Sequence, residues 1–215
     1  MTRALGWSSL AGLAAGLVMG FGVAPREVTQ GNVQRIMYLH VPAVWVAYLA
    51  FGIVFLASIV YLARRSGTAD RLAHAAAEVG VLFTGITIAS GAIWGKPTWG
   101  TWWTWDARLT SVAILFVMYL GYLLLRATID DVDRRARYAA VLGIVAALDM
   151  PLVHFSVSWW RTLHQPPSVM KPGGMTMSAV FWLAILVNFV GFVLLAGYFV
   201  SRRVELLARE QDALA

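Results

Sequence analysis

Six apolar segments, each close to the length needed to cross a membrane, constrain this chain more than any other feature. They cover residues 5–23, 41–63, 75–94, 109–125, 138–157 and 177–200. A helix of about 20 apolar residues spans the roughly 30 Å hydrocarbon core of a bilayer. Lipid offers the backbone no hydrogen-bond partners, and no alternating pattern of barrel strands appears, so the segments must be helices. The sequence therefore predicts an all-α, polytopic membrane bundle with six transmembrane helices.

The composition agrees with this class, because 60% of the residues are hydrophobic and only 13% are charged. Soluble domains carry more charge and less apolar surface. The connections between segments are short and no internal repeat is visible, so residues 1–215 are predicted to form a single integral membrane domain. The first segment, with Arg3 before its apolar run, has some features of a signal peptide. Its length of about 19 residues favours a retained span.

The distribution of basic residues predicts the orientation of the bundle. With the N-terminus inside, eleven of the 17 lysines and arginines fall on the cytoplasmic side and six on the opposite side. This asymmetry follows the positive-inside rule and places both termini in the cytoplasm. The net charge of +6 is then explained by topology and by attraction to anionic lipid, without a nucleic-acid partner. The chain has no cysteine, which excludes disulfide and thiolate chemistry.

The second outer loop, residues 94–110, reads WGKPTWGTWWTWDARLT and contains five tryptophans. Tryptophan is enriched at membrane interfaces, but anchoring requires fewer of them than this. If the loop were helical, its i, i+3, i+4, i+7 spacing would place four side chains on one face. These are Trp99, Trp102, Trp103 and Asp106. Such a stripe is more often used for packing, yet packing does not account for the adjoining lysine, aspartate and arginine.

Two of the four histidines, His40 and His164, are predicted to lie on the same side of the membrane as the tryptophans. His74 has Glu78 as a simple i,i+4 partner, and His154 lies inside the fifth span. Two neutral imidazoles beside a broad aromatic surface suit an iron porphyrin, since imidazole nitrogen ligates haem iron and aromatic rings cover the macrocycle. Cations on that side could bind the propionates. They are Lys96, Arg108, Arg35, Arg161 and Lys171.

Three strings of the sequence resemble the motifs of one family. The string WGKPTWGTWWTWDARLTS is similar to the tryptophan-rich WWD signature of haem-handling proteins in cytochrome c maturation. MYLHVPAVW around His40 and FSVSWWRTLHQPPSV around His164 resemble the two histidine motifs that flank this signature in the CcmC family. The related WWD haem lyases continue with a DPxE-like ending, whereas Asp106 is followed by Ala-Arg-Leu. The likeness covers nearly the whole chain and is specific to the CcmC family.

The resemblance implies a function in the bacterial inner membrane. A family member binds b-type haem non-covalently and in transit on the periplasmic side, and helps to load it onto the haem chaperone CcmE. It works beside CcmD and the CcmA–CcmB ABC transporter and is not an enzyme. By motif match, His40 and His164 would be the axial ligands of the haem iron. The loop residues implied to bind the cofactor are Trp94, Lys96, Trp99, Trp102, Trp103, Trp105, Asp106 and Arg108.

Two charged residues at the end of the tryptophan loop have separate expected roles. Arg108 is predicted to clamp a propionate, because its planar fork matches a carboxylate. Asp106 cannot pair with a propionate, so it would orient Arg108, accept an indole N–H, or contact the chaperone. The alternative is that both are interface charges at the start of a helix, where a carboxylate gains about 0.3–1 kcal/mol.

Two other classes of protein are alternatives to a haem-handling protein. A transmembrane b-type cytochrome expects ligand pairs deep within facing spans, and His154 has no such partner. A transporter expects broken helices and acidic residues near the centre of the membrane, which only Asp149 with Pro151 approaches. Asp149 is either a carboxyl group capping a kink at Pro151 or a residue supporting the haem site from beneath. Asn188 is a predicted interhelical hydrogen-bond partner.

Overall fold

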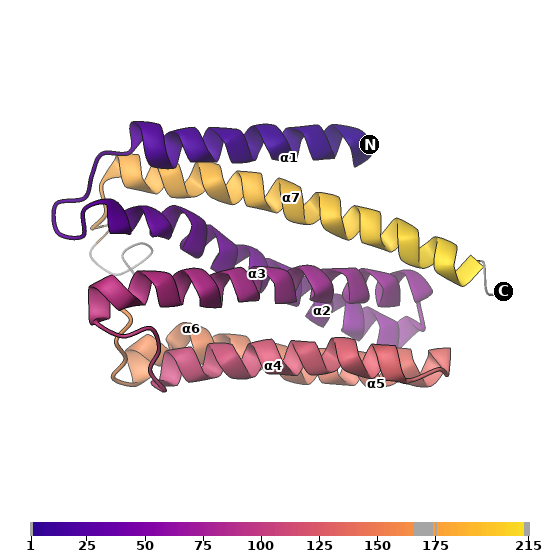
Figure 1. Cartoon of the computed structure of the whole chain (residues 1–215). Helices are drawn as coiled ribbons and strands as arrows, with labels where there is room; N and C mark the ends of the chain where they lie inside the picture. Colours follow the sequence, from indigo (N-terminus) through magenta and orange to yellow (C-terminus); the bar gives the residue numbers. More distant parts are fainter. Residues whose placement is uncertain (1, 166–173, 175, 213–215) are drawn as a thin grey trace.

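The computed structural model describes residues 2–165, 174 and 176–212, and these residues form helices joined by connections without a strand (Figure 1). Six helical stretches of the described chain are long and apolar enough to cross a membrane. They are Thr2–Val23, Asn32–Arg64, Gly67–Trp99, Ala107–Thr128, Val132–Trp159 and Ala179–Glu210. The predicted all-α bundle of six spanning helices is therefore confirmed.

The helices can be followed in chain order in Figure 1. Helix α1 (Thr2–Leu17) continues through a π-helical turn, η1 (Val18–Val23), and a 3₁₀ turn, η2 (Asn32–Ile36), leads into α2 (Met37–Arg64). The others are α3 (Gly67–Trp99), α4 (Ala107–Thr128), α5 (Val132–Ala147), α6 (Asp149–Trp159) and α7 (Ala179–Asp212). The start of α1 and the end of α7 lie at one end of the bundle, as an even number of spans requires. Its assignment to the cytoplasm stays a prediction.

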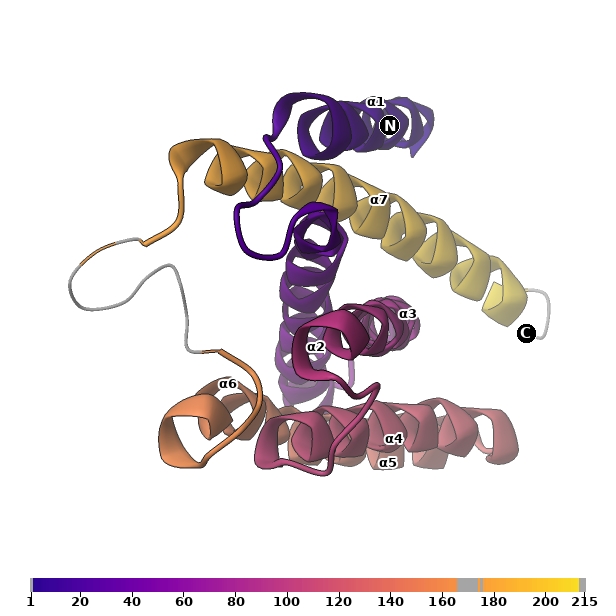
Figure 2. The same cartoon turned by 60° about the vertical axis from the view of Figure 1, so that its left-hand side comes forward.

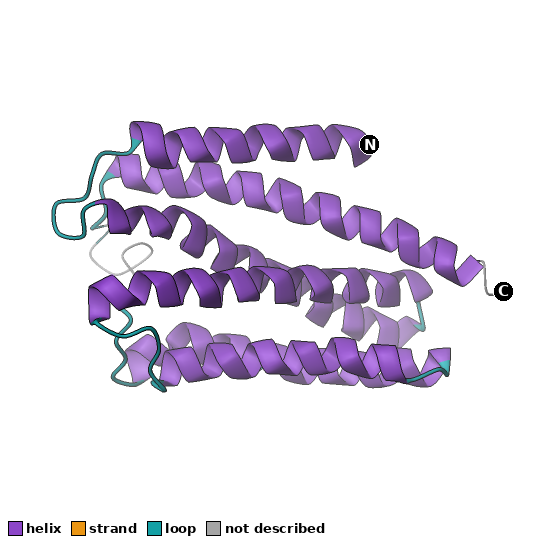
Figure 3. Cartoon of the chain, in the orientation of Figure 1, coloured by secondary structure: helices purple, strands orange, loops and turns teal. Residues whose placement is uncertain are grey.

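The connections at the two ends of the bundle differ in length. At the end near the termini, residues 65–66 and 129–131 suffice to join neighbouring helices (Figure 3). The opposite end carries the longer connections, which include residues 24–31 and 100–106. The tryptophan loop and the connections that flank the two motif histidines therefore meet at one end, as the sequence predicted.

The helices form three layers, with α1 and α7 on one side, α2 and α3 in the centre, and α4, α5 and α6 on the other side (Figure 2). Glycines allow α1 and α7 to approach closely, since a Cβ on Gly12 would lie 2.9 Å from the Cα of Gly191. Asn188 reinforces this contact, because its Nδ2 donates to the carbonyl oxygen of Gly16 at 3.0 Å. The predicted interhelical role of Asn188 is confirmed.

The centre of the bundle is packed around aromatic rings that meet small residues. The ring of Phe51 on α2 stacks on Tyr119 of α4, with centroids 3.7 Å apart. Gly80 of α3 faces the same ring, and any Cβ there would collide with it. Interiors this closely packed do not tolerate added volume without strain. Helices α2, α3 and α4 are therefore held in a defined register, which positions the cavity described below.

The fifth span is not one continuous helix. Its predicted segment, residues 138–157, contains a break at Leu148, where α5 ends and α6 begins. Pro151 lies in the first turn of α6, where the missing N–H leaves no hydrogen bond unmade. The helix is therefore interrupted three residues before Pro151, but no capping hydrogen bond from Asp149 accompanies the interruption. Among the described residues, Oδ2 of Asp149 is buried without a hydrogen-bond partner.

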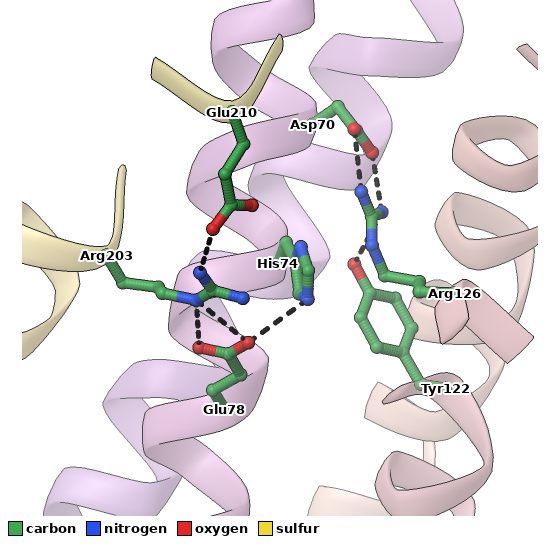
Figure 4. A network of polar contacts seen from close by, with 7 residues as sticks. All are labelled: Asp70, His74, Glu78, Tyr122, Arg126, Arg203 and Glu210. Carbon is green, nitrogen blue, oxygen red and sulfur yellow. Dashed lines mark hydrogen bonds and ion pairs between the residues drawn. The ribbon is translucent and has the colours of Figure 1, made fainter. Parts of the chain in front are cut away.

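A network of charged residues joins three helices at the end near the termini (Figure 4). Arg126 of α4 donates two hydrogen bonds, of 2.6 and 2.8 Å, to the carboxylate of Asp70 on α3, and both side chains are buried. On α3, Glu78 binds His74 at 3.2 Å, as the sequence predicted, and also Arg203 of α7 at 2.8 Å. Bidentate contacts of this kind are geometrically specific. The network ties α4 and α7 to α3, far from the longer connections.

Candidate functional site

One cavity brings together six of the ten residues predicted to bind the cofactor or its iron. It lies between α2, α3, α4 and α6 at the end with the longer connections, and it comprises about 930 Å³ of space not filled by atoms, its open mouth included. Its walls are mostly apolar and aromatic, and they include two histidines and one arginine. The predicted site residues that line it are His40, Trp94, Trp99, Trp103, Arg108 and His164.

His40 stands on the first turn of α2, and its ring is held by α3. Its Nδ1 lies 3.1 Å from Oγ of Ser90, whose hydroxyl donates to the carbonyl oxygen of Ile86 at 2.6 Å. Because the hydroxyl hydrogen of Ser90 is used in the bond to Ile86, the Ser90 oxygen accepts a hydrogen bond from His40. Nδ1 of His40 therefore carries the hydrogen. Gly91 makes room for the imidazole, because a Cβ there would lie 3.0 Å from Cε1. Nε2 of His40 therefore keeps a free lone pair, as a metal-ligating histidine requires.

His164 lies in the connection that follows α6. Its Nδ1 is 2.9 Å from the backbone oxygen of Gln165, and since a carbonyl only accepts, Nδ1 carries the hydrogen here too. Burial, together with the nearby positive charge of Arg108, lowers the pKa of His164 to about 4. The imidazole is therefore neutral at physiological pH. Both cavity histidines present Nε2 as the available ligand atom.

The other two histidines lie elsewhere. His74 belongs to the network at the far end of the bundle. His154 is exposed on α6, with its ring edge against Phe155 at 4.9 Å, and does not line the cavity. No cluster of three or more histidine, aspartate or glutamate ligands occurs in the described residues. The cavity thus supplies two imidazole ligands, which suits a metal ion whose remaining ligands belong to a bound cofactor, as in haem.

The tryptophans of residues 94–110 divide into two groups. Helix α3 extends beyond its predicted end to Trp99 and stops at Gly100, whose φ of 79° a side chain would disfavour. The connection that follows is not helical, so the shared helical face predicted for Trp99, Trp102, Trp103 and Asp106 does not form. Trp102 and Trp105 are 56% and 79% exposed and lie outside the cavity. Trp94, Trp99 and Trp103 line the cavity wall.

Asp106 joins three parts of the site. Its Oδ1 accepts from the backbone N–H of Leu109 at 2.9 Å and so caps α4. Its Oδ2 accepts from the backbone N–H of Leu163 at 3.0 Å, next to His164. The cap agrees with the alternative expected from the sequence, a carboxylate at the start of a helix, whereas the bond to Leu163 was not among the expected roles. One carboxylate therefore holds the tryptophan loop, the start of α4 and the connection that carries the second histidine.

Among the described residues that line the cavity, Arg108 is the one with a fixed positive charge. Its Nη1 donates to the backbone oxygen of Val153 on α6 at 3.4 Å, and it forms no ion pair with any described residue. The other predicted propionate partners lie elsewhere: Lys96 donates to Gly100 at 3.1 Å, Arg35 binds the oxygen of Gly20, and Arg161 is exposed. None of these three lines the cavity. Lys171 lies outside the described residues.

Several residues of the site were missed by sequence reasoning. Ser90 positions His40, and Gln30 accepts from the indole N–H of Trp94 at 2.8 Å. Tyr48 lines the cavity eight positions after His40, on the same helical face. That spacing was a usable signal for Tyr48, whereas nothing local in the sequence linked Gln30 to a tryptophan on another helix.

One family model and three relatives show what this chain is similar to. The family described as "CcmC: Heme exporter protein C" matches residues 1–215. A Bradyrhizobium diazoefficiens protein named "Heme exporter protein C" is 43% identical over 99% of the chain and 82% of its own length. A protein of the same name from Haemophilus influenzae is 40% identical over 94% of the chain and 82% of its own length. A Marchantia polymorpha protein named "Putative cytochrome c biosynthesis ccmC-like mitochondrial protein" is 38% identical over 86% of the chain and 78% of its own length. The chain belongs to the CcmC family.

Proposed function

We propose that this protein binds haem in the cavity and hands it on during cytochrome c maturation. The observation that carries the proposal is that two histidines, each with its Nδ1 engaged in a hydrogen bond, line the same aromatic cavity, which leaves both Nε2 atoms as the available ligands. Haem supplies the four equatorial ligands of its iron, so two imidazoles complete the coordination. The names of the relatives, heme exporter protein C, support the same cargo.

The axial ligands in this proposal are His40 and His164. Iron held by two histidines has no open position for oxygen or peroxide, so the site suits holding and transfer rather than oxidation chemistry. The haem is therefore a non-covalent b-type cargo in transit, and the protein acts as a carrier rather than an enzyme. The two ligands come from different elements, one on a rigid helix and one on a connection. Movement of the connection would release the iron without unfolding the bundle.

The remaining site residues fall into an inner and an outer set. Trp94, Trp99 and Trp103 line the cavity and would cover the porphyrin, while Arg108 would bind a propionate. Trp102, Trp105 and Lys96 lie outside the cavity, where they would contact haem projecting from its mouth or the protein that receives it. Exposed tryptophans are common at sites of protein contact.

The proposed setting is the bacterial inner membrane, with the cavity on the periplasmic side and both termini in the cytoplasm. The receiving protein would be the chaperone CcmE, and CcmD and the CcmA–CcmB ABC transporter would be the membrane partners. The distribution of basic residues supports this orientation. The position of the cavity supports it too, because residues of the longer connections, such as Gln30, Trp103 and His164, line it, and these connections lie at the end away from the termini.

An absorption spectrum of the purified protein tests the proposal. The full chain, extracted in detergent and titrated with haem, should show a six-coordinate, low-spin spectrum. Replacing His40 or His164 with alanine should abolish that spectrum. His74→Ala is the matched control and should leave it intact, because His74 lies near the start of α3, at the end of the bundle away from the cavity. A protein that stays colourless after haem is added would refute the proposal, and equal loss in all three variants would refute the ligand assignment.

A further inference from the structure

The cavity is polar at its floor as well as at its mouth. Between His40 and Tyr48 the helix α2 rises by about 12 Å, so Tyr48 lies well below the level of the histidine. Tyr48 lines the cavity, and its hydroxyl oxygen is buried with no hydrogen-bond partner among the described residues. Burying a hydroxyl group without a partner costs free energy, so such a group in a cavity wall calls for an explanation.

The guanidinium of Arg108 lies in the same cavity, close enough to interact electrostatically with Tyr48 at the floor and with His40 and His164 above it. Although Arg108 is in the first turn of α4, its Nη1 reaches the backbone oxygen of Val153, which is buried on α6. Between Val153 and the end of α6 at Trp159 the helix rises by about 9 Å. One weak hydrogen bond of 3.4 Å uses only part of the five N–H donors of an arginine. The floor of the cavity thus holds a positive charge with donors to spare.

Apart from Arg108, no described residue that lines the cavity carries a fixed positive charge. The polar lining residues nearer the longer connections are neutral ones such as Gln30, Thr98 and Gln165. Trp103 is a further neutral donor, whose indole N–H is buried without a partner in the described chain. A carboxylate withdrawn from water needs a cation as well as hydrogen bonds. Arg108 is the sole cation among the described residues of the lining, and its surroundings, which include Tyr48, are therefore the favourable place for a carboxylate.

We propose that Tyr48 and Arg108 form a carboxylate-binding subsite in the cavity floor, so that haem is held with its propionate edge toward the membrane interior. This inference rests on the proposed haem-binding function and deepens it. Arg108 would bind one propionate through its planar fork, and the hydroxyl of Tyr48 would donate to a propionate oxygen. The opposite, apolar edge of the porphyrin then faces the tryptophan loop and the mouth, where a receiving protein would meet it.

Asp149 belongs to the surroundings of this subsite, because its carboxyl group is close enough to Tyr48 to interact with it electrostatically. Negative charge at Asp149 would oppose a propionate rather than attract it. Asp149→Asn should therefore leave propionate binding unchanged or strengthen it. A loss equal to that of Tyr48→Phe would show that Tyr48 serves Asp149 and not the cargo, and would overturn the inference.

The experiment compares haem with haem dimethyl ester, in which both propionates are esterified and uncharged. The full-length protein in detergent should bind haem at least tenfold more tightly than the ester, as removal of charge-assisted hydrogen bonds predicts. Tyr48→Phe and Arg108→Gln should each reduce this preference about tenfold or more, with unchanged affinity for the ester and a retained low-spin spectrum. Tyr38→Phe, on the same helix but outside the cavity lining, is the matched control and should keep the preference.

The outcomes separate this inference from the proposed function. A protein that binds neither compound would refute haem binding itself. A low-spin complex with both compounds at equal affinity would refute only the subsite. If Trp103→Phe or Lys96→Gln abolished the preference while Tyr48→Phe kept it, the propionates would point to the mouth and the inferred orientation would be wrong.

Discussion

Replacing Asp106 with alanine should weaken haem binding although Asp106 does not line the cavity. The change removes the N-cap of α4, which is worth about 1 kcal/mol, and the hydrogen bond from Leu163, which as a bond to a charged acceptor is worth about 1.5–3 kcal/mol. The second contact holds the connection next to His164. If its loss is fully transmitted to the placement of that ligand, the affinity for haem falls about ten- to a hundredfold.

The assay is a haem titration followed by absorption, which reports affinity and spin state together. Asp106→Ala should shift part of the haem from the six-coordinate to a five-coordinate form, and added imidazole should restore the low-spin signal by replacing the misplaced His164. Asp131→Ala is the matched control, because Asp131 caps α5 at 2.7 Å from the N–H of Arg134 at the opposite end of the bundle. Wild-type affinity in Asp106→Ala, or an equal loss in Asp131→Ala, would refute the reasoning.

Three further predictions follow from other contacts. Ser90→Ala should weaken haem binding about tenfold, measured by titration, because the imidazole of His40 loses the hydrogen bond that orients it. Unchanged affinity would show that packing alone orients the ring. Trp103→Ala should speed haem loss to a competing apo-globin more than Trp105→Ala does, because the Trp105 side chain is 79% exposed. The reverse order would contradict the assignment of Trp103 to the inner set and Trp105 to the outer set. Arg126→Ala should destabilise the protein by about 3–5 kcal/mol, seen as a lower thermal midpoint, since a buried carboxylate loses its partner; an unchanged midpoint would contradict this.

The sequence predicted most of the fold because the signals for membrane helices are local. An apolar run of sufficient length must become a helix in lipid whatever surrounds it, so all six spans were found. The i,i+4 pair of His74 and Glu78 is local for the same reason. Helix ends were less accurate, because α3 continues through Pro97 to Trp99 before Gly100 stops it. A glycine in the left-handed region ends a helix more reliably than a change in hydropathy does.

The six spans and the types of residue at the site follow from the sequence alone, whereas the packing of the helices sets which of those residues line the cavity. Five tryptophans look equivalent along the chain, yet three line the cavity and two are exposed. The bond between Asp106 and Leu163, and the meeting of Tyr48 with Arg108 in one cavity, join segments far apart in the chain. Such contacts depend on the register in which helices pack, and that register is set by rings and glycines on facing helices, as at Phe51 and Gly80. Periodicity along one segment carries no information about them.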